Sequence, residues 1–435
     1  MAQTKAVKAN SMNLWSVTAM GIGAMVGAGI FALLGQAALV AGEETYVAFI
    51  LAGVVALLSG YSFAKLGVRY PDAGGLSTFF DRGFGTGKLA GCLSLIYLLT
   101  LAVCVALLAK AFGSYAAALL GIRASPVWIN VFASGITVLL LFLNVAGSEL
   151  VGKAEILLVG IKLLILATLM VAGGIGMTHK APSEHLHPGI LAVVGSVGFT
   201  FLAYAGFGMM TNAAANVKQP QTTIPRSIYL AIATVIVVYV GLAIVVLGNL
   251  TPAALAQHPN TAVAEAAMPV LGHIGYVIVS AGALLATASG INAYLFGSLK
   301  ISKSMAAAGQ LPTMFSQILW HKGSRGYLLG AAAVLVAINT LDLKALADIA
   351  SATFLMVYFA VHVAHWRLIH ETTGSRPIIA AGIITMGLVL AGFLWTTAAA
   401  QPWSVVFIGI LIAGSWTIEV MLARHFVGSK AQVRS

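Results

Sequence analysis

Long apolar segments recur along almost the whole chain and constrain its fold more than any other feature of the sequence. A helix needs about 20 apolar residues to cross the hydrocarbon core of a bilayer. Hydrophobic residues make up 60% of the 435 residues and charged residues 8%, which is far more apolar than a soluble globular protein. The expected spans are 13–40, 46–68, 85–116, 126–146, 151–174, 189–213, 226–248, 275–303, 327–341, 345–367, 377–398 and 402–424. We therefore predict an all-α integral membrane protein with twelve transmembrane helices.

The distribution of basic residues predicts the orientation in the membrane. The net charge is +11, but the Lys and Arg residues are scattered singly between apolar segments, so the sequence does not predict nucleic-acid binding. If the N-terminus is cytoplasmic, Arg123, Lys180 and Lys344 lie outside, Lys110 and Lys162 lie within spans, and all other basic residues lie on the cytoplasmic side. This asymmetry is the positive-inside pattern. We expect a multi-pass protein of the cell (inner) membrane with both termini cytoplasmic.

Metal and catalytic chemistry have little support in the sequence. Cys92 and Cys104 lie in the same apolar segment without the spacing of a metal or disulfide site, so we interpret both as small core residues. His179, His185 and His187 share one external loop, where solvated side chains are a simpler explanation than a metal site. A membrane enzyme would need acidic, His or Cys side chains converging within the spans. We expect no metal, no enzyme and no cofactor, with a proton as the coupling ion.

Two other histidines and one lysine lie near the ends of predicted spans. His362 and His365 are three residues apart near the cytoplasmic end of the tenth span, on one face of a helix. An interfacial position is the simpler account of this pair. Lys110, near the end of the third span, is expected to extend its ammonium group to the outer surface.

The first span contains a run of glycines from Gly21 to Phe31. Each glycine in a helix interior costs about 1 kcal/mol relative to alanine. Non-helical backbone at mid-membrane is tolerated where it lines a cavity or is buried in protein, so the run indicates a break that offers its backbone to a polar ligand. The alternative is that the glycines allow neighbouring helices to pack closely. The run alone does not decide between the two.

A second interruption occurs five spans later, between Gly198 and Gly208. Paired interruptions in segments that run in opposite directions are typical of inverted-repeat transporters with a site at mid-membrane. We predict a single transmembrane domain over 1–435, with repeat one at 13–174, repeat two at 189–367 and two additional helices at 377–424. The stretches 69–83, 179–188 and 216–226 are expected to be loops.

Several of these segments resemble the amino acid-polyamine-organocation (APC) superfamily. The matching segments are Gly23–Phe31 in the first helix, Phe201–Gly208 in the sixth, Pro220–Ile228 after it, Ser289–Ala293 in the eighth and Ala308–Pro312 at its exit. The segment Ile161–Leu166 is most similar to the ApcT type, proton-coupled transporters of broad amino-acid specificity. The resemblance implies a LeuT-type 5+5 inverted repeat with broken helices one and six. The sequence departs from the family at 214–218, which lacks the glutamates common after the sixth helix.

The two breaks supply groups for both ends of an amino acid. Amides at the start of the half helix after the first break would face a carboxylate, where the helix dipole is favourable, and carbonyls of the second break would accept from an ammonium. The expected substrate-binding residues are Gly23, Met25, Val26, Gly27, Ala28, Gly29, Phe201, Leu202, Ala203, Tyr204, Ala205 and Phe207. For any one aromatic residue, ordinary helix packing is an equally good interpretation. Because this lining is apolar and no Asp or Glu lies deep within a span, we expect neutral amino acids as substrates.

Lys162 is the residue expected to carry the coupling proton. It lies twelve residues into the fifth span, where a charged side chain costs at least a few kcal/mol and marks a functional hypothesis. By the family resemblance, its ammonium would join the carbonyl near Gly23 to the hydroxyl of Thr287 or Ser289. The alternative is a structural lysine that is permanently satisfied by carbonyl groups.

The sequence thus predicts a secondary active transporter that imports neutral amino acids by proton symport through alternating access. An amino-acid exchanger and a non-transporting membrane sensor share the same expected site and remain alternatives. The expected partners are the amino acid and membrane lipid, with no obligate protein partner.

Overall fold

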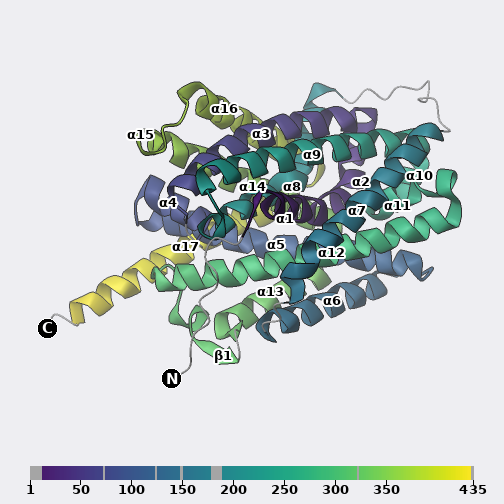
Figure 1. The fold of residues 1–435 in the computed structure, drawn as a ribbon. Coiled ribbons are helices and arrows are strands. Elements are labelled where there is room, and N and C mark those ends of the chain that lie inside the picture. Colours follow the sequence, from purple (N-terminus) through teal and green to yellow (C-terminus); the bar gives the residue numbers. More distant parts are fainter. Residues whose placement is uncertain are drawn as a thin grey trace.

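The computed structural model describes residues 12–71, 74–122, 125–146, 150–177, 189–320 and 323–432. Helices occupy most of this length and form one bundle (Figure 1); 3₁₀-helices are labelled η. The first half contains α1 (Leu14–Ala28), α2 (Ile30–Ala41), η1 (Gly42–Glu44), α3 (Thr45–Arg69), α4 (Leu76–Phe84), α5 (Lys88–Leu119), α6 (Pro126–Ala146) and α7 (Leu150–Ile175). The second half contains α8 (Ile190–Tyr204), η2 (Ala205–Asn216), α9 (Pro220–Asn249), α10 (Pro252–Gln257), η3 (Pro259–Thr261), α11 (Ala262–Glu265), α12 (Met268–Ala307), η4 (Thr313–Phe315), α13 (Arg325–Thr340), α14 (Leu343–Arg367), α15 (Ile369–Thr372), α16 (Arg376–Ala400) and α17 (Pro402–Gln432).

Each predicted span coincides with a helix or with a pair of consecutive helices. Within the described residues, ten helical segments are long and apolar enough to cross a membrane, and 14–27 and 325–340 form shorter apolar helices. The first predicted span corresponds to α1 followed by α2, and the sixth corresponds to α8 followed by η2. The multi-pass helical architecture is confirmed, whereas the twelve crossings and the inverted repeat stay predictions.

Several elements between the spans differ from the expected loops. The stretch 69–83 contains α4, which begins after Gly75, and Gly75 has a φ of 57°. The stretch 216–226 was expected to be a loop, but α9 already begins at Pro220, where a proline is tolerated because the amide it lacks would have no intrahelical partner. The helix also continues through Pro225, which lies inside it. A short antiparallel pair, β1 (Ile318–Trp320) and β2 (Gly323–Ser324), connects η4 to α13. The predicted loop at 179–188 lies outside the described residues.

Polar side chains cap the starts of several helices. Asn13 accepts from Ser16 N at 2.9 Å at the start of α1. Asp342 accepts from Ala345 N at 2.7 Å at the start of α14. Both satisfy amides that have no partner within the first helical turn, so the sequence itself marks where these helices begin.

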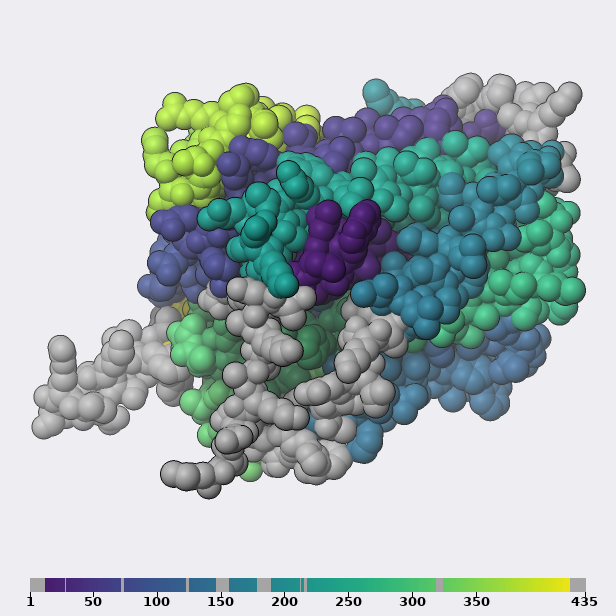
Figure 2. All heavy atoms as spheres, in the orientation of Figure 1, coloured from purple at the N-terminus to yellow at the C-terminus, as the bar shows by residue number. Residues whose placement is uncertain are grey.

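The broken first helix lies in the middle of the bundle. In Figure 1, α1 runs between α3 and α9 on one side and α5 and α12 on the other, and it packs against α7, α9, α12 and η2. One part of α1 reaches the surface, where Figure 2 shows it in purple between the teal segment of η2 and α9 and the blue segment of α7. Large exposed apolar side chains cover the outer helices, among them Trp128, Leu139, Trp395 and Trp403. A bilayer is the solvent that such a surface requires.

Candidate functional site

The interruption of the first helix is confined to one residue. α1 ends at Ala28, α2 begins at Ile30, and Gly29 between them has φ −116° and ψ −68°. The Gly29 carbonyl accepts from Ala32 N at 3.2 Å and from Leu33 N at 2.9 Å. The break therefore lies within the glycine run, but it is confined to Gly29, because the residues from Met25 to Ala28 remain within α1.

The interruption of the sixth span is longer. α8 ends at Tyr204 and continues as the twelve-residue 3₁₀-helix η2 from Ala205 to Asn216. Runs of 3₁₀-helix longer than three or four residues are uncommon and often mark a functional hinge. The break predicted between Gly198 and Gly208 is confirmed at Ala205.

The two interruptions contact each other through their backbones. A Cβ atom added to Gly29 would lie 2.4 Å from Ala203 Cα, and one added to Gly206 would lie 2.6 Å from Met25 N. Gly27 meets α12 in the same way, because a Cβ there would lie 3.0 Å from Ala286 O. Close packing, the alternative interpretation of the glycine run, therefore holds for these glycines. It also brings the two breaks together.

The predicted substrate-binding residues belong to the helices that meet at this contact, except Gly29, which lies between two of them. Ala28 is the last residue of α1. The others are all buried: Gly23, Met25, Val26, Gly27, Gly29, Phe201, Leu202, Ala203, Tyr204, Ala205 and Phe207.

Tyrosine hydroxyls that the sequence analysis missed bind the carbonyls of both breaks. Tyr239 of α9 donates to Met25 O at 2.8 Å and is 3.2 Å from Ala203 O, so that one hydroxyl group joins the two breaks. Tyr358 of α14 donates to Ala205 O. A buried tyrosine usually finds a hydrogen-bond partner, so tyrosines in apolar spans were a signal that their hydroxyls bind polar groups of other helices.

Aromatic rings enclose the second break. The ring centroid of Tyr358 lies 5.5 Å from those of both Phe201 and Phe207, and 4.6 Å from that of Phe63. Tyr204, predicted as a substrate contact, directs its hydroxyl elsewhere and donates to Phe49 O at 3.1 Å. The surroundings of the break are thus largely apolar, with hydroxyl groups at fixed positions.

Tyr294 of α12 is a further candidate that the sequence analysis did not identify. Its side chain is 2% exposed, and its hydroxyl has no hydrogen-bond partner among the described residues. A buried hydroxyl without a partner costs free energy, so Tyr294 is suited to bind a polar group of a ligand.

Lys162 faces the interior of the bundle. It is 1% exposed, whereas its neighbours Ile161 and Leu164 are 37% and 68% exposed. Its helix, α7, packs against both α1 and α12, the helices to which the family resemblance assigns its partners. The assignment to Gly23 and α12 stays a prediction.

The two hydroxyl groups proposed for Lys162 have different environments. Thr287 is buried and donates to Ala283 O at 2.7 Å, which leaves its oxygen lone pairs as acceptors. Ser289 is partly exposed, and two residues along a helix point in nearly opposite directions. The two hydroxyl groups therefore cannot both face the same ammonium in this conformation.

Three side chains expected at the membrane surface lie inside the protein instead. Lys110 is 9% exposed and donates to Asn130 Oδ1 of α6 instead of extending outward. His362 and His365 are both 0% exposed and bind serine hydroxyls of α3. Neighbouring helices cover these three side chains. Their short distance from a helix end therefore did not predict how exposed they are.

Buried carboxylates lie apart from the breaks. Among the described residues, the buried acidic side chains are Asp348 and Glu419. Asp348 lies near the start of α14 and accepts from Ser404 Oγ of α17 at 2.9 Å. Glu419 belongs to α17 and approaches Gly91 of α5. Neither contact involves α1, α2, α8 or η2.

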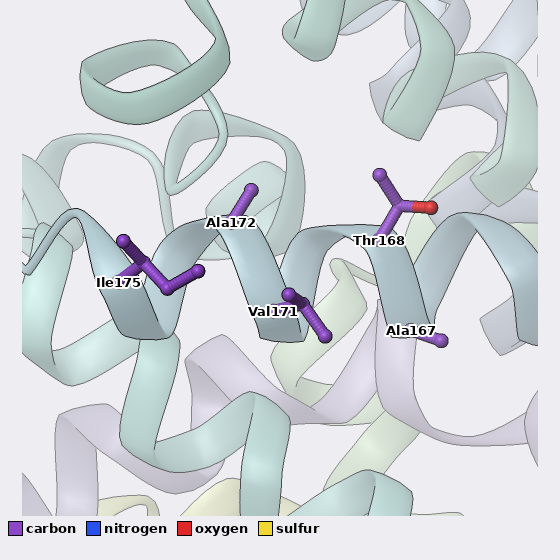
Figure 3. A pocket seen from close by; sticks show the side chains of 5 residues that line it. All are labelled: Ala167, Thr168, Val171, Ala172 and Ile175. Atoms are coloured by element: carbon purple, nitrogen blue, oxygen red, sulfur yellow. The ribbon is translucent and has the colours of Figure 1, made fainter.

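A groove on the outside of α7 has a different character. Figure 3 shows its lining, Ala167, Thr168, Val171, Ala172 and Ile175, along a single helix. These side chains are apolar except for Thr168, whose hydroxyl donates to Leu164 O of its own helix at 2.8 Å. The groove is suited to lipid and offers no groups for a charged ligand.

Comparison with known proteins identifies the family. The sequence profile described as Amino acid permease matches residues 16–424, which includes both breaks. The chain belongs to the amino acid permease family, within the APC superfamily. The resemblance found in the sequence is thereby confirmed.

Relatives extend along most of the chain. The Escherichia coli inner membrane transport protein YbaT is 45% identical over 88% of this chain and 90% of its own length. An uncharacterized protein of Methanocaldococcus jannaschii is 34% identical over 93% of this chain and 95% of its own length. The methylthioribose transporter of Bacillus subtilis is 26% identical over 73% of this chain and 72% of its own length. The family supports an amino-acid transporter, and two of these relatives carry names that describe transport proteins.

Proposed function

We propose that this protein imports neutral amino acids across the inner membrane by proton symport and alternating access. The observation that carries the proposal is the contact between the two helix breaks, where the Tyr239 hydroxyl joins Met25 O to Ala203 O. Twelve crossings, an inverted repeat and cytoplasmic termini belong to the same proposal. The name of the YbaT relative supports the inner-membrane location.

Recognition of the amino-acid backbone follows from the polarity of the broken helices. The start of α2 presents amides and the positive end of a helix dipole, which favour a carboxylate. The Ala205 carbonyl accepts from the Tyr358 hydroxyl, and the Ala203 carbonyl lies 3.2 Å from the Tyr239 hydroxyl, whose hydrogen goes to Met25 O. Both carbonyl oxygens are acceptors that an ammonium group can use. The tyrosines thus hold the acceptors in place before the substrate binds.

Selectivity for neutral side chains follows from the apolar surroundings of the break. Phe201 and Phe207 lie there, whereas the buried carboxylates Asp348 and Glu419 bind other parts of the bundle. A cationic side chain would lack the counter-charge that a buried charge requires.

Competition for uptake into reconstituted vesicles tests the substrate class. Unlabelled alanine and leucine should inhibit uptake far better than arginine, lysine or putrescine. If arginine proved the best competitor, the assignment of the pocket would be wrong.

Alternating access requires that contacts at the two ends of the broken helix open in turn. On the N-terminal side, Lys218 N donates to Met12 O at 3.2 Å and Ser227 Oγ donates to Leu14 O at 3.3 Å. At the other end, Gln36 of α2 donates to Asn260 Oδ1 of η3 at 2.9 Å. These bonds lie at opposite ends of the broken helix, so opening one end does not by itself require breaking the bonds at the other.

Exchange and sensing are the alternatives that share this site. An exchanger would accelerate the exit of labelled amino acid when unlabelled amino acid is added outside, without responding to a pH gradient. A sensor would bind amino acid without accumulating it in vesicles. Net uptake that increases with an inward proton gradient would exclude both alternatives.

A further inference from the structure

A row of buried polar side chains joins α3 to α14. Ser59 Oγ lies 3.0 Å from His362 Nε2, and Ser62 Oγ lies 3.0 Å from His362 Nδ1. Ser62 Oγ is also 2.9 Å from His365 Nδ1, and Thr372 Oγ1 of α15 is 3.1 Å from His365 Nε2. Five side chains thus form one unbranched chain of hydrogen bonds, hereafter the His–Ser chain.

The positions of the hydrogens at the α15 end of the His–Ser chain can be assigned from the hydrogen bond that Thr372 donates to the backbone. A hydroxyl and a neutral imidazole each have one hydrogen to donate. The Thr372 hydroxyl donates to Leu368 O at 3.0 Å, so it accepts from His365 Nε2. His365 Nδ1 is then an acceptor and receives the hydrogen of Ser62.

The same logic fixes the other end of the chain. Because Ser62 donates to His365, it must accept from Nδ1–H of His362. His362 Nε2 is then an acceptor and receives the hydrogen of Ser59. The tautomers are thus assigned from the network, and every donor in the chain points from Ser59 toward Thr372.

Packing holds both imidazole rings in place. A Cβ atom on Gly382 of α16 would lie 2.5 Å from His362 Nδ1, and one on Gly374 would lie 2.9 Å from His365 Nε2. The ring of Tyr61 lies 5.9 Å from that of His365. Among the described residues, titratable and charged groups near the Thr372 end include Tyr61, Lys65, Arg69 and Tyr70 of α3 and its C-terminal end, and Glu371 of α15. The chain therefore runs from an apolar interior toward a charged end of the bundle.

The starting end of the chain lies close to the second helix break. Tyr358, which donates to Ala205 O, lies one turn before His362 on the same face of α14. A proton at the break thus has one helical turn of α14 to cross before it reaches the chain. At the other end, Lys65 Nζ donates to Thr373 O at 3.4 Å, directly after α15.

A chain with this polarity can transfer one proton along its length. A proton that binds His362 Nε2, after the Ser59 hydroxyl turns away, allows Nδ1–H to pass to Ser62. Ser62 passes its own hydrogen to His365 Nδ1, and the hydrogen on His365 Nε2 leaves at the Thr372 end. One proton enters and one leaves, and both rings end neutral.

We propose that the His–Ser chain conducts the coupled proton from the helix breaks to the α15 end of the bundle. This inference rests on the proton symport proposed above, and under the proposed orientation the α15 end is cytoplasmic. The two histidines then act on proton movement without contacting the amino acid.

Substitution of Ser62 tests the inference, because Ser62→Ala interrupts the chain at its middle and leaves both histidines in place. Purified variants in vesicles that contain a pH-sensitive dye would be given alanine as substrate, with and without an inward proton gradient. Ser62→Ala should lose both the acidification that accompanies uptake and the acceleration by the gradient, while exchange of alanine without a gradient continues. Ser62→Thr, which restores a hydroxyl, should regain both.

Ser302→Ala is the matched control, because Ser302 is also a buried serine but its hydroxyl donates to Leu299 O of its own helix. It should acidify the vesicles as the wild type does. Normal acidification by Ser62→Ala would overturn the inference. If Ser62→Ala loses exchange as well, His365→Gln interrupts the chain elsewhere, and normal acidification by this variant overturns it. Uptake by the wild type without acidification would overturn symport itself, and the role of the chain with it.

Discussion

Tyr239 joins the two interrupted helices through one hydroxyl group. Tyr239→Phe keeps the ring packing against Phe49 and Tyr204 but leaves Met25 O without its donor and removes the hydroxyl group that lies 3.2 Å from Ala203 O. We expect a loss of about 1–3 kcal/mol in the free energy of unfolding, the cost of buried polar groups that lose a partner. Substrate affinity should also fall, because the breaks are no longer held together. Thermal unfolding in detergent and binding of labelled alanine measure the two effects.

Tyr204→Phe is the control for this prediction. Tyr204 is buried beside Tyr239 but donates to Phe49 O of α3 and not to a break. It should lower stability with a smaller effect on affinity. Equal affinities of wild type and Tyr239→Phe would contradict the role assigned to the bridging hydroxyl.

Tyr70, directly after α3, gives the structure a testable response to alkaline pH. Burial and the hydrogen bond to Glu371 Oε2 at 2.7 Å together raise the pKa of Tyr70 from an ordinary value of 10.0 to about 12. Folding therefore favours the neutral phenol, and this contribution to stability is present below pH 10 and is lost as the pH rises toward 12.

Tyr70→Phe should consequently lose stability less steeply than the wild type between pH 10 and 12. Unfolding temperatures in detergent across this range would measure the difference. Tyr46→Phe, an exposed tyrosine at the other end of α3, serves as the reference. Parallel curves for Tyr70→Phe and the wild type would show that Tyr70 does not contribute.

Residue types in the sequence predicted part of the site. Lys162 stood out as a charge within an apolar segment, and the structure confirms that it is buried. The roles of Tyr239, Tyr358 and His362 were not predicted, because each depends on a partner more than 100 residues away in sequence. Ser59 and Ser62 share the three-residue spacing of His362 and His365. Two such polar pairs in apolar helices must satisfy each other, and this was the signal available in the sequence.

At the scale of elements, the glycines of the first helix have an identifiable packing role. Gly29→Ala would place a Cβ atom 2.4 Å from Ala203 Cα, which is backbone and cannot rotate away. We expect a loss of about 1–3 kcal/mol in stability from overpacking, together with weaker substrate binding as the breaks move apart. Larger side chains at Gly27 or Gly29 would disturb folding itself, so alanine is the sharper test.

Gly160→Ala is the matched control for the change at Gly29. A Cβ on Gly160 of α7 has no neighbouring atom within 4 Å, and alanine in a helix interior gains up to about 1 kcal/mol over glycine. Thermal unfolding should therefore show that Gly29→Ala is less stable than the wild type and that Gly160→Ala is at least as stable. Alanine binding should weaken in Gly29→Ala and not in Gly160→Ala. A Gly29→Ala protein as stable as Gly160→Ala would refute close packing at the break.

The positions of the long helices could be predicted from the sequence, because they follow from the lengths of the apolar segments. Every predicted span corresponds to helix in the structure, and both interruptions occur within the glycine-rich segments. The exact form of the breaks was not predictable, because Met25 stays helical through packing against η2 and α12. The short helices α10 and α11 were also missed, since six or fewer residues carry too little periodicity to be recognised.

At the scale of the whole molecule, transport requires that proton and substrate act on the same moving element. α1 is suited to this role, because it forms one side of the helix-break contact and also packs against α7, the helix of Lys162. A charged lysine inside a membrane protein is held by oxygen partners, and rearrangement of α1 would change those partners. Proton binding at Lys162 and substrate binding at the breaks would thus stabilise the same arrangement of α1.

Lys162→Ala should therefore bind alanine, because the helix breaks remain intact, but should lose the acceleration of uptake by an inward proton gradient. Binding in detergent and uptake into vesicles with imposed pH gradients measure the two properties on one preparation. Lys110→Ala is the control, since Lys110 is also a buried lysine but bonds Asn130 at the contact of α5 with α6; it should retain the gradient response. If Lys162→Ala still concentrates alanine when the gradient is imposed, the coupling proton binds elsewhere. In that case, the variants of the His–Ser chain show where the coupling proton binds. If they lose the gradient response, His362 and His365 both bind this proton and release it.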